Sequence, residues 1–154
     1  MRILLIGFQL HTKMRKPNGK YFNSTLCTIC FCSEGERKLI PEKYKESVQK
    51  YITGVIQDKR RSHKLLAINC MPDHIHIFVG LHPAQSISAL VSEIKTSSAK
   101  FIKKQEWMPF NFEWQDGYGA FTYSRSHIDA VVQYILTQEE HHRKRTFKEE
   151  YIGF

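Results

Sequence analysis

The chain has 154 residues, of which 42% are hydrophobic and 25% charged, so it is long enough to bury a core as a single domain. This composition, with 10 Phe, 7 Tyr and 2 Trp, excludes a disordered chain. The 23 Lys and Arg residues exceed the 15 Asp and Glu residues, and the resulting net charge of +8 favours a polyanionic partner if the charges cluster.

The net charge is concentrated at the N-terminus. Residues 1–22 contain five basic side chains and no acidic one, which leaves +3 of the total +8 for residues 23–154. The apolar run from Ile3 to Leu10 is shorter than the roughly 20 residues of a membrane-spanning helix and lacks the features of a secretory signal. We therefore expect a basic leader, flexible or non-native, at 1–22, a single domain at 23–154, a cytoplasmic location and no membrane partner.

The first predicted element is a buried strand at residues 25–32, where the sequence is apolar and β-branched. Its three cysteines, Cys27, Cys30 and Cys32, could be small core residues or zinc ligands. Because side chains alternate faces along a strand, Cys27 points away from the other two, which favours the core interpretation.

The middle of the chain predicts a helix and then a hairpin. Pro41 suits the first turn of a helix that runs to about Gln57, with apolar residues at helical spacing. Strands at 63–70 and 74–81 are joined by the short link Met71-Pro72-Asp73, so they should pair as a β-hairpin.

The last third predicts two helices separated by two short strands. The first helix should begin at Ser86 or Ser88 and end before Pro109. Strands follow at 112–114 and 118–123. A final helix from about 127 to 141 should be capped by Ser126 together with Asp129. This order of elements predicts an α+β fold, broadly ferredoxin-like, in which helices pack on an antiparallel sheet.

Two polar groups in this pattern could carry chemistry. His74 and His76 share one face of a strand whose other face is aliphatic, so both imidazoles could hold a divalent metal; the alternative is a pair of locally hydrogen-bonded sheet histidines. On the last helix, Tyr134, Gln138 and His141 form a stripe beside the apolar face; the alternative for Tyr134 is a tyrosine at the rim of the core.

Together these groups predict a reaction at a phosphodiester. His74 and His76, with the amide oxygen of Gln138, could hold Mg²⁺ or Mn²⁺, and Tyr134 would lie one helical turn from that ligand. A tyrosine hydroxyl is a weak nucleophile at neutral pH, but a metal that polarises the phosphate lets it attack.

At these motifs the sequence resembles the small single-tyrosine HUH transposases of bacterial insertion sequences, including their REP-associated relatives. The resemblance runs from about Thr25 to Phe154 through three segments that occur in the family's order. They are residues 71–79 (MPDHIHIFV), 114–118 (WQDGY) and 134–142 (YILTQEEHH).

The resemblance implies roles for individual residues. His74, His76 and Gln138 would be the metal ligands, and Tyr134 would form a 5′-phosphotyrosine link to single-stranded DNA with hairpin ends. Members of the family are homodimers with composite active sites. Further roles are expected for the hinge glycines Gly117 and Gly119, and for the DNA-contacting lysines Lys95, Lys100, Lys103 and Lys104. His141 and His142 also match the family, and helix-end histidines facing the helix dipole are their plain interpretation.

Two other functions compete with the transposase. The first is a domesticated protein that binds DNA hairpins without cutting them, but its site would be expected to lose residues. The second is a nucleotide hydrolase of the histidine-triad kind, which needs a third alternating histidine where this chain has Phe78.

Overall fold

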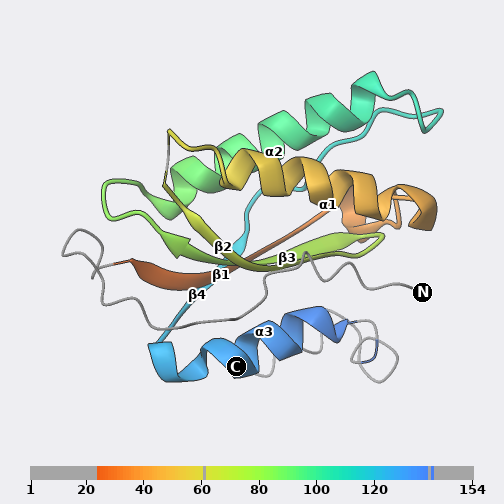
Figure 1. The fold of residues 1–154 in the computed structure, drawn as a ribbon. Helices are drawn as coiled ribbons and strands as arrows, with labels where there is room; N and C mark the ends of the chain where they lie inside the picture. Colours follow the sequence, from red (N-terminus) through yellow and green to blue (C-terminus); the bar gives the residue numbers. More distant parts are fainter. Residues whose placement is uncertain (1–23, 61, 139, 141–154) are drawn as a thin grey trace.

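The computed structural model describes residues 24–60, 62–138 and 140 (Figure 1). The predicted leader at 1–22, as well as His141 and His142, lies outside these residues. The elements, in chain order, are β1 (Thr25–Cys32), the 3₁₀ turn η1 (Glu34–Glu36), α1 (Glu42–Ile56), β2 (Lys64–Cys70), β3 (His74–Leu81), α2 (Ile87–Lys104), β4 (Gly119–Tyr123), the 3₁₀ turn η2 (Arg125–His127) and α3 (Ile128–Leu136).

The four strands form one antiparallel sheet in the order β2-β3-β1-β4. The β1–α1–β2 unit is split by β3, which lies between β1 and β2, as in ferredoxin-like folds. Helices α1 and α2 cover one face of the sheet and α3 covers the other (Figure 1). The predicted α+β class is therefore confirmed, with the helices divided between two faces.

The alternation of side chains along β3 separates two clusters of buried residues. All eight residues of β3 are buried, because the strand is central and covered on both faces. Ile75 and Ile77 pack in the larger cluster with α1 and α2. Phe78 packs in a smaller cluster with Val131 and Ile135 of α3. The second face of β3 is thus turned toward α3.

One predicted strand is absent from the structure. Residues 112–114 do not form a strand, and this segment contacts β1 only through an isolated bridge between Ser33 and Trp114. The reason lies in Trp114, whose ring packs edge-on against Phe31 and whose Nε1 donates to Ser98 Oγ at 2.9 Å. The indole is therefore committed to the core between the sheet and α2.

The start of the last helix also differs from the prediction. Ser126 does not cap α3, which begins at Ile128 without a side-chain cap and is preceded by η2. The hydroxyl of Ser126 instead lies 2.8 Å from Ser124 Oγ. By contrast, Ser86 caps α2 as expected, because its hydroxyl accepts from the Ala89 amide. In the part of the chain that is described, no helix combines the length and apolar character needed to cross a membrane.

Candidate functional site

The two histidines of β3 form the centre of the candidate site. His74 and His76 are only 2% and 5% exposed, and their ring centroids are 5.0 Å apart with the rings nearly perpendicular. Both lie on the α3 face of the sheet, as the alternation predicts, while Ile75 between them packs in the opposite cluster. Buried imidazoles need polar partners, so the contacts of each ring define what it can do.

The two rings have different neighbours. His74 Nδ1 lies 2.6 Å from Asp73 Oδ1, a short contact between an imidazole and a carboxylate. His76 Nε2 lies 3.9 Å from the thiol of Cys30, the residue directly opposite on β1. Asp73 was not predicted as a site residue, although a carboxylate immediately before the first histidine of a strand is a signal for it.

Helix α3 brings the predicted tyrosine to this pair. The Tyr134 ring is 6.4 Å from the His76 ring, edge to face, and the residue is 38% exposed. The helix is held by Asn69 of β2, whose Nδ2 donates to the carbonyl of Ile135 at 2.9 Å. Asn69 also pairs with His76 in the sheet, so one residue links the strand register to the tyrosine helix. Its signal in the sequence is a single amide within the apolar run 65–70.

Gln138 completes the set with a buried amide. The residue is fully buried, and its Nε2 donates to the carbonyl of Tyr134 at 3.3 Å. Its Oε1 is buried and has no hydrogen-bond partner among the described residues. An unsatisfied buried oxygen costs about 1–3 kcal/mol, which indicates a place for a further partner.

His74 and His76 can form a site for a divalent cation only together with the amide of Gln138. Among residues 24–60, 62–138 and 140, no group of three or more His, Cys, Asp or Glu side chains could hold a metal. A cation bound by His74 and His76 therefore needs another kind of ligand, and the unpaired Oε1 of Gln138 is an oxygen donor of the required type.

The structure gives Lys95 a local role. Its Nζ donates to the carbonyl of Gln115 at 2.7 Å and to that of Gly117, and it lies 5.2 Å from the centre of the Phe31 ring. Desolvation of the ammonium group lowers the pKa of Lys95, while the nearby Asp116 carboxylate acts in the opposite direction. Lys95 thus anchors the turn that precedes β4.

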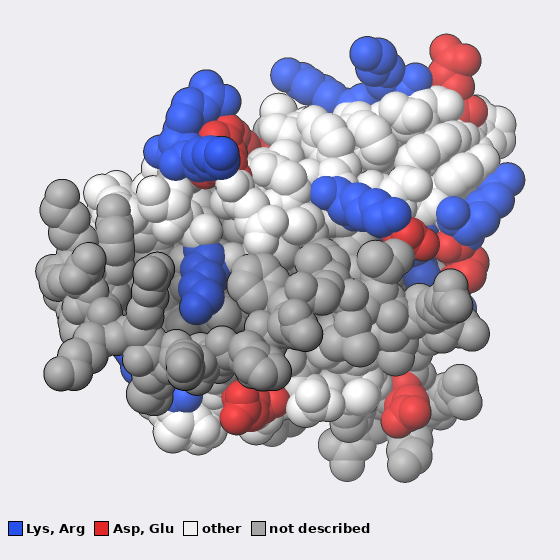
Figure 2. Space-filling view, in the orientation of Figure 1, with Lys and Arg blue, Asp and Glu red and all other residues white. Residues whose placement is uncertain are grey.

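The other predicted DNA-contacting lysines lie on the same helix, across the sheet from the histidines. Lys100, Lys103 and Lys104 are exposed, and Lys103 Nζ lies 3.5 Å from Glu113 Oε1. Figure 2 shows blue side chains close to red ones over the half of the molecule that carries α1 and α2. The DNA contact of these lysines stays a prediction.

The two predicted hinge glycines occupy different positions. Gly117 has a φ of +84°, a conformation that side-chain-bearing residues rarely adopt, so glycine is required in this turn. Gly119 is the first residue of β4 and pairs with Cys30 of β1. The segment from Gly117 to Gly119 therefore connects the turn anchored by Lys95 to the strand that leads into α3. Its role as a hinge stays a prediction.

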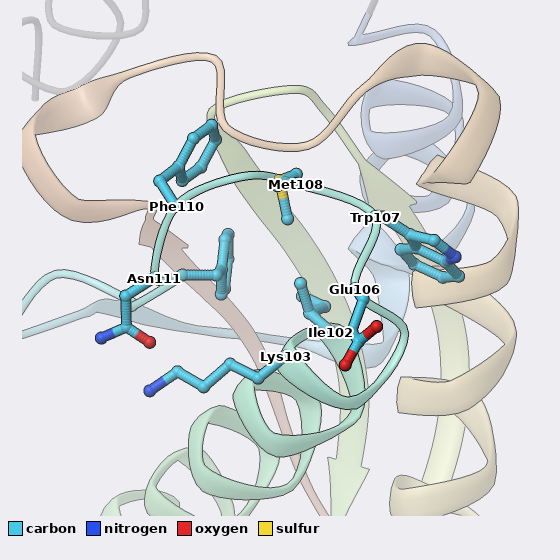
Figure 3. Close-up of a pocket in the computed structure, with 8 residues that line it drawn as sticks. Ile102, Lys103, Glu106, Trp107, Met108, Phe110 and Asn111 are labelled. Carbon is cyan, nitrogen blue, oxygen red and sulfur yellow. The ribbon is translucent and has the colours of Figure 1, made fainter.

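A separate hollow lies at the end of α2 (Figure 3). It has a volume of about 150 Å³ and, of the predicted site residues, is lined only by Lys103. Its other lining residues are Ile102, Glu106, Trp107, Met108, Phe110, Asn111 and Phe112. Because Ile102 and Phe112 belong to the cluster on the α1/α2 side, this hollow is distinct from the histidine site.

Among the solved structures that resemble the chain, two are of proteins named as transposases. One, from Deinococcus radiodurans R1 and named as a candidate transposase, is 20% identical with a TM-score of 0.61, over 81% of this chain and 98% of that chain. The other, a REP-associated tyrosine transposase bound to a REP hairpin, is 17% identical with a TM-score of 0.61, over 84% of this chain and 74% of that chain. At this identity, the likeness shows the fold, which is that of the single-tyrosine transposases.

The sequence comparison identifies the family. Residues 22–138 match the family described as "Transposase IS200 like". This match spans most of the chain, so the protein belongs to the IS200-like family of single-tyrosine transposases. No curated protein matches the chain.

Proposed function

We propose that this transposase cuts and rejoins single-stranded DNA through a covalent tyrosine intermediate, with Tyr134 as the nucleophile. The supporting observation is the grouping of Tyr134, His74 and His76, together with the buried amide of Gln138, which donates to the Tyr134 carbonyl. The family membership supports a transposase, and this grouping supports the chemistry.

His74, His76 and Gln138 would hold a divalent metal, Mg²⁺ or Mn²⁺. When bound, such a cation acts as a Lewis acid that polarises the phosphodiester and stabilises its charge. The burial of the two imidazoles limits water around the reacting phosphate, which strengthens electrostatic interactions there.

Tyr134 would form the covalent link. Its oxygen attacks phosphorus, the bond from phosphorus to the 3′ oxygen breaks, and the tyrosine becomes joined to the 5′ phosphate. The hydroxyl proton leaves Tyr134, and the departing 3′ oxygen takes up a proton to become a 3′-hydroxyl. With 38% of the residue exposed, a DNA strand can approach it from solvent.

The partner proposed is single-stranded DNA with hairpin ends. One structural relative is bound to a REP hairpin, which supports this class of ligand. The resemblance further predicts a homodimer with composite active sites, while the described chain holds Tyr134 beside its own His76.

Trapping the adduct tests the proposal. The protein is incubated with hairpin-bearing single-stranded DNA and Mn²⁺, and a label at the DNA's 3′ end should become protein-linked, whereas a 5′ label should be released. The Tyr134→Phe substitution and the addition of EDTA should each reduce the yield of the covalent adduct by at least about 100-fold. Tyr51→Phe is the control, because Tyr51 stacks on Phe101 on the opposite side of the sheet and Phe preserves the stack. An undiminished adduct in Tyr134→Phe contradicts the assignment, and hairpin binding without any adduct favours the binding-only alternative.

A further inference from the structure

We propose that Asp73 is a positioning residue that fixes the tautomer and orientation of His74, and that buried Ser33 holds Asp73 in place. This inference rests on the proposed function, because it concerns how His74 is prepared to bind the metal. It assigns a role to two residues that touch neither the metal nor the DNA in the proposed mechanism.

The contact between Asp73 and His74 defines which nitrogen carries the hydrogen. Oδ1 of Asp73 lies 2.6 Å from Nδ1 of His74. A carboxylate only accepts hydrogen bonds, so Nδ1 must be the donor. In the neutral ring, Nε2 then carries the lone pair that a metal ligand needs. A hydrogen-bonded carboxylate of this kind also strengthens an imidazole as a metal ligand.

The backbone around Asp73 is fixed from two sides. Its carbonyl accepts from the backbone N–H of Ser33 at 2.8 Å, and the Ser33 hydroxyl lies 3.1 Å from the same oxygen. Ser33 is fully buried at the end of β1. On the other side, the Met71 amide donates to the carbonyl of His74 at 2.8 Å, which closes the turn between β2 and β3. The carboxylate is therefore presented to His74 by a rigid support.

The Asp73 carboxylate contacts only one ring nitrogen of the pair in the contacts described above, that of His74. His76 Nε2 faces the Cys30 thiol at 3.9 Å, which is a weak hydrogen-bonding partner. Asp73 is 28% exposed in its side chain, so it retains water on its outer side while orienting the almost fully buried His74 ring. The charge-assisted contact with Asp73 is therefore what orients the His74 ring.

Removal of the carboxylate should change both the ring and the metal affinity. Because the hydrogen bonds to Ser33 use the Asp73 backbone, the Asp73→Ala variant should retain the folded sheet. An NMR spectrum of its backbone amides checks this. In the metal-free wild type, ¹⁵N spectra of the histidine rings should show His74 with its hydrogen on Nδ1. Asp73→Ala should shift that ring toward the Nε2–H form and weaken the binding of Mn²⁺ alone, measured by calorimetry, by about 10–100-fold.

Matched variants isolate the cause. Asp73→Asn removes one negative charge and keeps an acceptor, so it should retain the tautomer but bind Mn²⁺ more weakly. Glu46→Gln removes the same charge on exposed α1 and should leave both readouts unchanged. If Asp73→Ala keeps the wild-type ring spectrum and Mn²⁺ affinity, the role of Asp73 is wrong although the metal site stands. If the wild type binds no Mn²⁺, the metal site of the proposed function is itself wrong.

Discussion

At the scale of single residues, two buried thiols make the free energy of unfolding depend on pH in the alkaline range. Burial raises the pKa of Cys27 from 9.0 to about 11 and that of Cys70 from 9.0 to about 12, the latter opposed by the charge of Lys45. Above about pH 9, the unfolded chain loses these protons while the folded protein keeps them. The free energy of unfolding therefore decreases as the pH rises from about 9 toward 11 and 12.

A cysteine variant should reduce this dependence. We expect Cys27→Ala combined with Cys70→Ala to lose less stability between about pH 8 and about pH 10.5 than the wild type does, even though the cavities lower its stability at both values. Urea unfolding at the two pH values measures the difference. Cys32→Ala, which changes a half-buried thiol of β1, is the control. Equal losses in the wild type and the double variant would contradict the coupling.

The candidate site could be partly predicted from residue patterns. Period-two alternation put His74 and His76 on one face, because the aliphatic residues between them have to face a core. The position of Asp73 before the first histidine is a local signal, but its support by Ser33 could not be predicted, because that contact joins the end of β1 to a turn 40 residues later. Asn69 stands out as an amide among apolar residues, but the sequence does not show that its partner is a backbone carbonyl of α3.

At the scale of elements, α2 anchors the chain that leads to the tyrosine helix. Lys95 donates to two carbonyls in the turn between Trp114 and β4, and Ser98 of the same helix accepts from the Trp114 indole. Both contacts fasten the 114–117 segment to one side of α2. The position of β4, and with it the path into α3, thus depends on a helix that lies on the other face of the sheet (Figure 1).

Removing the ammonium of Lys95 should destabilise the protein. Lys95→Met retains most of the aliphatic stem but loses the charged hydrogen bonds to Gln115 and Gly117, so we expect the free energy of unfolding to fall by about 1–3 kcal/mol. Lys100→Met on the exposed part of α2 should change it by less than about 0.5 kcal/mol. Urea unfolding measures both. If the two variants are equally stable, the anchor is not significant. The same two variants also test the DNA contact: if Lys95→Met reduces the salt dependence of hairpin binding and Lys100→Met does not, Lys95 contacts a phosphate.

The elements that the sequence predicted correctly are those with a regular period and a local signal. β1, β3 and the Ser86 cap of α2 are examples, because alternation, burial and capping act within a few residues. The segment 112–114 has the composition of a strand, but its indole is committed to Ser98 and Phe31 instead. Ser126 has the spacing of a cap, but its hydroxyl contacts Ser124. Tertiary contacts overrode the local pattern at Trp114, and a competing local contact did so at Ser126.

At the scale of the whole molecule, the site lies between the sheet and its less heavily packed helix. The larger buried cluster joins the sheet to α1 and α2, whereas α3 is held by Val131 and Ile135 against Ala67 and Phe78. The histidines lie on the buried central strand β3, and Tyr134 lies on the helix that packs in the smaller cluster. In the composite dimer that the resemblance predicts, α3 would have to exchange this smaller cluster for packing on a partner's sheet.

Mixing two inactive variants distinguishes these arrangements. In the described chain Val131 and Ile135 are buried against its own sheet, and Asn69 fixes the Ile135 carbonyl. We therefore expect Tyr134→Phe mixed with His74→Ala to remain inactive in the adduct assay, because each molecule lacks one half of its own site. Recovery toward about a quarter of wild-type activity would instead show that a partner's helix supplies the tyrosine. Random pairing makes about half of the dimers mixed, and each mixed composite dimer would have one complete site of two. Unmixed samples of each variant at the same total concentration provide the baseline.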